Sequence, residues 1–270
     1  MNVSLYQRSD IPRFDIPEVK ERVSAIEWKT RVDLAACYRL VAFFGWNQLV
    51  YNHISARIPG DDEHYLLNPL GLLYEEITAS NLVKVDLEGN IVDKTPYRVP
   101  PAGFTLHRAV HQARPDVQCV LHTHTVANMA VSAMECGLLP LTQNAMLFHG
   151  KVAYHDFEGL AVDCDENERV ARDLGDKPIL ILRNHGLLVA GARISVTFLM
   201  TYTLELAMQA QVQALASGQK LVVPSEDAAI QTARLGFDND DFRAAEDPAG
   251  RIEWPAMLRL IDRLDPSYKT

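Results

Sequence analysis

The chain has 270 residues, 48% of them hydrophobic and 23% charged, an ordinary globular composition with enough apolar sequence for a large core. Its formal net charge of −9 argues against nucleic acid as a partner, because phosphate binding needs a basic patch. No apolar run approaches the roughly 18 residues of a membrane span, and the first residues lack the apolar core of a signal peptide. We therefore expect a cytoplasmic protein with no membrane partner. Four scattered cysteines without CxxC spacing predict reduced thiols.

Hydrophobic periodicity predicts helices and strands that are interleaved along the chain. In chain order the patterns predict a helix over 26–46, strands over 53–58, 64–68 and 82–87, a helix over 104–114, a strand that carries His122 and His124, a helix over 126–136, a strand over 152–157, a helix over 167–174, a strand over 178–186 and a helix over 194–217. The early strands follow one another without helices between them, which favours a mixed sheet with helices packed on it. No Rossmann or P-loop glycine motif is present.

The composition divides the chain into three parts. Residues 1–22 are polar, contain two prolines and predict an N-terminal arm. The main domain is expected over 23–220, and 221–270 form a C-terminal extension. The helix over 194–217 has apolar positions around much of its circumference, so we expect it to be buried on more than one side.

A pair of histidines at the end of an apolar run is the most informative motif. His122 and His124 are two residues apart, and on a strand residues i and i+2 point to the same face. Both rings could therefore chelate one metal ion. His185 ends another apolar run, although by itself it could equally be a turn histidine bonded to backbone. If the two strand ends meet, three nitrogens leave a position open, which is typical of a working metal rather than a structural one.

The remaining histidines give weaker signals. His107 and His111 are four residues apart on a predicted helix and share a face, but the glutamate of a HExxH motif is missing. A solvated helix face is therefore the favoured interpretation, with His107 as a possible orienting group for the metal ligands. His53 and His64 have no visible partner in the sequence and are assigned surface or packing roles.

Five stretches resemble, in the same order, sequences of the class II aldolase/adducin family, and the likeness extends over roughly residues 30–218. They are Tyr51–Arg57, Leu67–Tyr74, Ala113–Val117, Val120–His124 and Leu182–Gly186. Two further stretches, Pro101–His107 and Val152–Asp156, are closer to the adducin branch than to the sugar-phosphate aldolases.

This resemblance implies a fold and a metal. The family fold is a three-layer α/β/α structure with a central, mainly antiparallel sheet, usually assembled as a homotetramer with active sites near subunit interfaces. Its divalent metal, commonly zinc, is held by the histidines that match His122, His124 and His185. All three are kept in this chain.

The departures from the family pattern concern the substrate. Sugar-phosphate members carry a catalytic acidic residue where this chain has Gly103, four positions before His107. Their phosphate-binding serines match Pro101 and Ala102, and the glycine of their GNxS loop matches Tyr51. A phosphate needs charged, hydroxyl or backbone donors, and several are lost here. We therefore expect a non-phosphorylated substrate.

The leading hypothesis is a metal-dependent lyase acting on a small carbonyl or hydroxy-acid substrate, by aldol-type C–C cleavage or by decarboxylation. Retro-aldol cleavage needs a base for the hydroxyl proton as well as a metal, whereas decarboxylation needs only an electron sink. Candidate catalytic residues are His149, Tyr154 and His107, and His155 or a neighbouring subunit could also supply the base.

Two other functions stay open. An all-histidine site accommodates iron as well as zinc, so a non-haem iron oxygenase is the second hypothesis, although such enzymes more commonly use two histidines and a carboxylate. The third is a non-catalytic, adducin-like binding module. Convergent imidazoles argue against that role, because burying them without a metal leaves polar groups unpaired.

Overall fold

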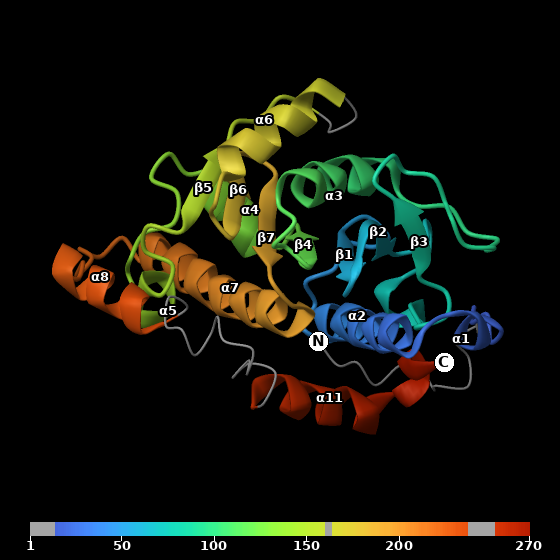
Figure 1. The fold of residues 1–270 in the computed structure, drawn as a ribbon. Helices are drawn as coiled ribbons and strands as arrows, with labels where there is room; N and C mark the ends of the chain where they lie inside the picture. The colour runs from blue at the N-terminus through green and yellow to red at the C-terminus, as the bar shows by residue number, and fades with distance from the viewer. Residues whose placement is uncertain (1–13, 160–163, 237–251) are drawn as a thin grey trace.

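A seven-stranded sheet runs through the molecule in the order β3-β2-β1-β4-β7-β6-β5 (Figure 1). The computed structural model describes residues 14–159, 164–236 and 252–270. The strands are β1 (His53–Ile58), β2 (Asp61–Leu67), β3 (Val83–Asp86), β4 (Cys119–Thr123), β5 (Val152–His155), β6 (Ile179–Leu182) and β7 (Gly186–Gly191). Neighbouring strands are antiparallel except β5 and β6, which are parallel. The expected mainly antiparallel sheet is confirmed.

Helices cover both faces of this sheet and make three layers (Figure 1). Their bounds are α1 (Val19–Arg22), α2 (Ala25–Phe43), α3 (Pro101–Ala113), α4 (Val126–Ser132), α5 (Gln143–Met146), α6 (Cys164–Leu174), α7 (Ile194–Ala216), α8 (Glu226–Leu235) and α11 (Glu253–Leu264), with short 3-10 helices at Tyr74–Glu76 and Pro266–Lys269. α3 and α6 pack on one face with the side chains of a buried cluster that includes Leu106, Val120 and Val170. α2, α4 and α7 pack on the other face. The α/β/α architecture is therefore confirmed.

Capping residues set the beginnings of the helices that flank the site. The Ser24 hydroxyl accepts a hydrogen bond from the Glu27 amide at the start of α2, and Thr125 accepts one from the Asn128 amide at the start of α4. Such side-chain caps satisfy amide groups that have no partner inside the helix. α7 buries residues around most of its circumference, as its apolar pattern predicts.

The register of β4 determines which way its histidine points. Val120 faces α3 and α6, whereas Leu121 belongs to the cluster on the opposite face. Because side chains alternate along a strand, His122 points to the α3 side, as Val120 does. The antiparallel pairing places His53 of β1 directly opposite His122.

Several elements were not predicted from the sequence. The sequence patterns predict no separate strand between residues 186 and 194, yet β7 is a fully buried strand whose apolar run has no alternation. The short helix α5 and the helix α8 were also missed. Most of the predicted N-terminal arm lies outside the described residues. The described end of the C-terminal part packs into the same core as α2, through Trp254, Ile261 and Tyr268.

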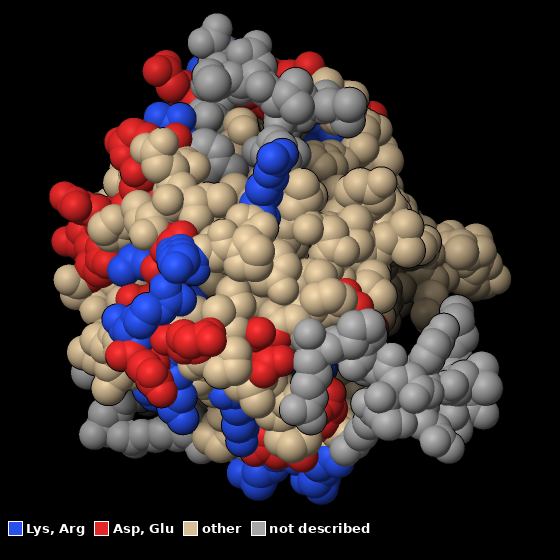
Figure 2. All heavy atoms as spheres, turned by 90° about the vertical axis from the view of Figure 1, so that its right-hand side faces the viewer, with Lys and Arg blue, Asp and Glu red and all other residues tan. Residues whose placement is uncertain are grey.

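The surface and helix lengths add two findings. On the face drawn in Figure 2, Lys and Arg side chains are interspersed with Asp and Glu, and the coloured residues of that face form no continuous basic surface. Among the described helices, none is both long and apolar enough to cross a membrane.

Candidate metal centre

The structure brings together the three histidines that the sequence singled out. One nitrogen from each of His122, His124 and His185 lies within 4.8 Å of the others. Their ring centroids are 4.5 to 4.9 Å apart. Within the part of the chain that the structure describes, no other group of three or more His, Cys, Asp or Glu residues converges in this way.

Oxygen acceptors fix the orientation of two of the rings. Nδ1 of His122 lies 3.0 Å from the carbonyl oxygen of Leu187 on β7. Nδ1 of His124 lies 2.8 Å from Oε1 of Gln48, in the loop before β1. A carbonyl oxygen only accepts, so each Nδ1 must carry the proton and donate it. This is the arrangement in which the second nitrogen of a metal-binding histidine is free to act as the ligand.

The two remaining nitrogens are then unpaired acceptors that face each other. Nε2 of His122 and Nε2 of His124 are 2.7 Å apart. Two lone pairs at this distance repel unless a cation or a proton lies between them. Burial and the neighbouring histidines lower the pKa of His122 well below its ordinary value, and burial lowers that of His124 to about 4. At neutral pH both rings are therefore uncharged, which is the form that binds metal.

His185 reaches this position from a tight turn rather than from a strand. β6 ends at Leu182, and residues 183–185 connect it to β7. Asn184 adopts a φ of 57°, a left-handed conformation that asparagine tolerates better than most residues. A Cβ atom on Gly186 would lie 2.5 Å from the Thr123 carbonyl oxygen and 2.9 Å from Cδ2 of His124. Glycine at 186 therefore lets the turn approach the end of β4.

His53 was missed by the sequence interpretation, which found no partner for it. Its ring stacks on His122, with centroids 5.0 Å apart and an interplanar angle of 28°. Its Nδ1 atom lies 2.7 Å from Nε2 of His107. The signal was in the sequence, because His53 and Ser55 are two residues apart on β1 and point to the same face. Their partners, however, depend on the pairing of β1 with β4 and on the contact of β1 with α3.

The predicted solvated face of His107 and His111 is wrong. Both rings are buried, with 0% and 1% of the residue surface exposed. They point toward β1, where the Ser55 hydroxyl contacts Nδ1 of His107 and lies 2.8 Å from Nε2 of His111. The polar atoms of Ser55 and His53 give this side of α3 hydrogen-bond partners, so burial leaves few groups unsatisfied.

The other candidate catalytic residues contact groups outside the triad. Nε2 of His149 lies 2.9 Å from a carboxylate oxygen of Glu226 in α8. The Tyr154 hydroxyl accepts a hydrogen bond from the Leu138 amide, and its ring lies 4.2 Å from the Arg183 guanidinium carbon. Their catalytic roles stay predictions.

His155, also considered as a base, is buried on the α6 side of β5. Its Nδ1 atom lies 2.8 Å from a carboxylate oxygen of Asp173. Its main-chain carbonyl accepts a hydrogen bond from the Arg183 amide, at the start of the turn that carries His185.

Comparison with known proteins identifies the group to which this fold and site belong. The model of the class II aldolase and adducin N-terminal domain matches residues 32–212. The chain belongs to the class II aldolase/adducin family. Its three convergent histidines lie inside the matched region of that family.

Members of the class II aldolase/adducin family resemble this chain over most of its length. A Caulobacter vibrioides protein, whose aldolase class 2 name is itself provisional, is 48% identical over 93% of this chain and 95% of its own. Rat alpha-adducin is 51% identical over 89% of this chain, which corresponds to 34% of the adducin. The crystal structure of an aldolase II superfamily protein from Pseudomonas syringae is 44% identical, with a TM-score of 0.87 over 94% of this chain and 100% of that one. These similarities support a lyase of the class II aldolase kind.

Proposed function

We propose that this protein is a metal-dependent lyase that acts on a small, non-phosphorylated carbonyl or hydroxy-acid substrate, by aldol-type C–C cleavage or by decarboxylation. The observation that carries the proposal is the pair of facing Nε2 atoms, 2.7 Å apart, with His185 beside them. Ring nitrogens that face each other without a proton between them are suited to bind a shared cation. Three protein ligands leave room on that cation for substrate oxygens.

His122, His124 and His185 would hold the metal, with zinc as the proposed ion. Nitrogen ligands suit zinc, and iron is the second choice. When bound, such a metal supplies a Lewis acid that stabilises negative charge on a substrate oxygen. The protein contributes the orientation of the ligands, since Gln48 and the Leu187 carbonyl hold the Nδ1 protons of His124 and His122 away from the metal position.

The loss of phosphate-binding residues supports the choice of substrate. Gly103 lies in α3 one turn before His107 and offers no side chain where sugar-phosphate members carry an acid. Pro101 and Ala102 replace their phosphate-binding serines. We keep His107, His149 and Tyr154 as candidate catalytic residues, and we propose a cytoplasmic homotetramer.

Metal analysis with matched variants tests the site. Alanine at His122, His124 or His185 should each remove most of the metal from freshly purified protein while the circular dichroism spectrum stays that of the wild type. His64→Ala is the matched control, because His64 is partly exposed and pairs with Asp61. Stoichiometric metal in all three triad variants would refute the assignment.

Turnover measurements test the reaction class. The zinc-loaded protein is offered a panel of small hydroxy acids, keto acids and sugar phosphates, with and without oxygen. Cleavage of a non-phosphorylated acid that stops on chelation supports the proposal and excludes a purely binding role. Full activity with zinc under anaerobic conditions excludes the iron oxygenase. Preference for a sugar phosphate contradicts the proposed substrate class.

A further inference from the structure

The short helix α4 connects the two segments that carry His124 and His185. His124 lies between the end of β4 and Thr125, which is the N-cap of α4. At the other end, the carbonyl oxygen of Ser132, the last residue of α4, accepts a hydrogen bond from the amide of Asn184, the residue before His185. The sheet places both segments, and α4 adds a second connection between them. Because a helix has a fixed rise per residue, this connection is stiff.

Glu205 of α7 is fully buried and holds the start of α4. Its carboxylate accepts hydrogen bonds from the Thr125 hydroxyl at 2.7 Å and from Nδ2 of Asn128 at 2.9 Å. Nδ2 of Asn128 also donates to the Thr123 hydroxyl oxygen at 3.0 Å. Since the Thr125 hydroxyl gives its single proton to Glu205, its oxygen is directed toward the main-chain amide of Asn128 as the N-cap acceptor. Glu205 is therefore linked to the residues on both sides of His124.

Arg183 holds the other end of α4 from the turn that carries His185. Nη1 of Arg183 lies 2.6 Å from the carbonyl oxygen of Met134, and Nη2 lies 3.4 Å from that of Glu135, in the chain that directly follows α4. The main-chain amide of Arg183 donates to the carbonyl of His155, which joins the same turn to β5. One residue thus ties the turn both to the end of α4 and to the sheet.

These two charged side chains match the electrostatics of α4. A helix carries partial positive charge at its N-terminus and partial negative charge at its C-terminus. Glu205 lies at the first and Arg183 at the second. Among the described residues Glu205 pairs with no Lys or Arg, so burying its carboxylate costs free energy that an apolar side chain would not cost. Apolar side chains, among them Ala127 and Val131, already pack α4 against α7, so the charges need a reason other than packing.

We propose that Glu205 and Arg183 are positioning residues of the candidate metal centre, which hold the two ends of α4 and so keep His124 and His185 at the separation that a shared ion needs. The inference rests on the function proposed above, which gives the three histidines a metal. Neither residue is a ligand, and each acts through hydrogen bonds to residues beside the ligands.

Competition with a chromophoric chelator measures the effect on zinc affinity. Glu205→Gln keeps the shape but replaces one acceptor oxygen with an amide group, and Arg183→Met keeps the stem of the side chain but removes both contacts with carbonyl oxygens. Each variant should bind zinc about ten-fold more weakly than the wild type. Wild-type zinc affinity in both variants overturns the proposal.

Asn81→Ala is the matched control for a purely structural effect. Asn81 is also fully buried, and its side chain accepts from the Thr78 amide and donates to the Glu76 carbonyl, in the turn before β3. The control should lower the free energy of unfolding and leave zinc affinity unchanged. If it weakens zinc binding as much as Glu205→Gln does, the effect is one of general stability and the positioning role is wrong.

An exchange of partners provides a rescue. Asn128→Asp alone sets two carboxylates against each other, whereas Asn128→Asp combined with Glu205→Gln restores a carboxylate facing an amide in the opposite order. A carboxylate in the first turn of α4 is also favourable for the helix. The double variant should recover most of the zinc affinity that Glu205→Gln loses. A folded double variant that binds zinc no better than Glu205→Gln contradicts the role of this contact.

The shared route through α4 predicts that the effects of the two positioning residues do not multiply. Glu205→Gln combined with Arg183→Met should weaken zinc binding by clearly less than the product of the two single losses, because either change already releases the helix. A loss equal to that product means that the residues act independently and overturns the route through α4.

Hydrogen exchange in the metal-free protein tests the same route without zinc. The amide of Asn128, bonded to Thr125, and the amide of Asn184, bonded to Ser132, should both exchange about ten-fold faster in Glu205→Gln than in the wild type. Faster exchange at Asn128 alone means that the effect does not reach the far end of α4, and overturns the proposal. Zinc affinities that follow the expected pattern without turnover of any acid would support the positioning role and contradict the proposed lyase alone.

Discussion

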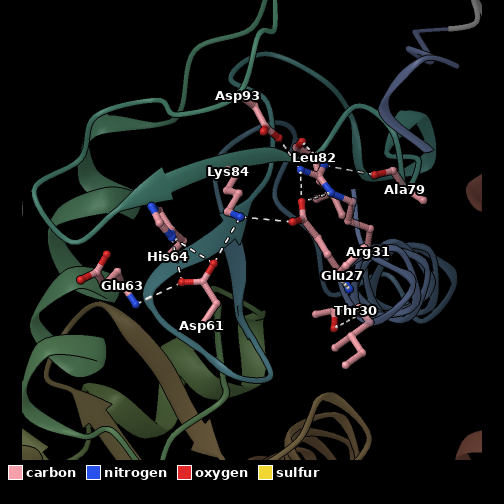
Figure 3. A network of polar contacts seen from close by, with 12 residues as sticks. Glu27, Thr30, Arg31, Asp61, Glu63, His64, Ala79, Leu82, Lys84 and Asp93 are labelled. Carbon is pink, nitrogen blue, oxygen red and sulfur yellow. Dashed lines mark hydrogen bonds and ion pairs between the residues drawn. The ribbon is translucent and has the colours of Figure 1, made fainter. Parts of the chain in front are cut away.

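Two polar clusters of this molecule differ in how completely their groups are paired. In the first, the fully buried Arg31 of α2 donates to Glu27, to Asp93 and to the carbonyls of Ala79 and Leu82 (Figure 3). In the second, the candidate metal centre, the Nε2 atoms of His122 and His124 face one another with no donor between them. Both clusters join elements that are distant in the sequence.

The first cluster extends from Glu27 toward β2, and its charged groups are paired there as well. Lys84 donates to Glu27 at 3.2 Å and pairs with Asp61 at the same distance, and Asp61 also contacts His64 (Figure 3). A buried charge network of this kind is stable only when its members are satisfied. The comparison indicates that a cluster whose groups are all paired stabilises the fold, whereas the histidine cluster, which is partly exposed and has facing nitrogens without a donor, is suited to a ligand.

The largest expected effect comes from breaking the cluster whose groups are all paired. Arg31→Met leaves Glu27 and Asp93 without their guanidinium partner, so the free energy of unfolding should fall by about 3–5 kcal/mol in urea titrations. Lys29→Ala is the control, because Lys29 is exposed where it pairs with Asp33, and should cost at most about 0.5 kcal/mol. Equal effects of the two variants would contradict the distinction.

A smaller effect is expected from the group that orients His124. Gln48→Ala removes the acceptor for Nδ1 and should weaken zinc binding about 10- to 100-fold, with little change in unfolding. Gln48→Glu keeps an acceptor and should bind zinc at least as tightly as the wild type. Competition with a chromophoric chelator measures both, and unchanged affinity in the alanine variant would show that Gln48 has no orienting role.

A third effect concerns the pH dependence of stability. Burial, Arg57 and Val117 together give folded His111 a pKa of about 3, whereas the ordinary value is 6.5. Below about pH 6.5 the unfolded chain therefore binds the proton first, and stability is lost as the pH falls toward 3. His111 alone contributes a slope of about 1.4 kcal/mol per pH unit in that range.

His111→Gln tests this slope by removing one titrating ring. Its free energy of unfolding should depend less steeply on pH than that of the wild type between about pH 4 and 6, by the same amount. Tyr65→Phe is the control, because the Tyr65 ring packs on His111 but its hydroxyl has no partner among the described residues. If the free energy of unfolding of His111→Gln depended on pH as steeply as that of the wild type, the His111 ring would be protonated in the folded protein over this pH range.

Local rules and the family resemblance together singled out the three histidines that converge. The spacing of His122 and His124 on a strand predicted that both rings point the same way, whereas the local pattern left His185 open as a turn histidine until the resemblance was considered. The central sheet followed from short strands without intervening helices and from the family resemblance.

The buried contacts of His107 and His111 could not be predicted in the same way. These contacts join β1 to α3 across a sequence separation of 52 to 56 residues, and nothing near His107 in the sequence indicates Ser55 as its partner. A polar helix face next to an apolar stripe looks solvated until the element packed against it is known. β7 was missed for a related reason, because a strand buried on both faces has no alternating pattern.

The register of β4 also determines when the three histidines of the candidate metal centre come together. His122 is placed by β1, which precedes it in the chain, and by β7, whose Leu187 lies 65 residues after it. A slip of one residue in either pairing would turn His122 toward α2 and α7. Pairings of such long range form slowly, so the ligands converge only in a nearly finished sheet. A metal ion held by all three histidines of the proposed site would therefore bind only after the strands of the sheet have paired.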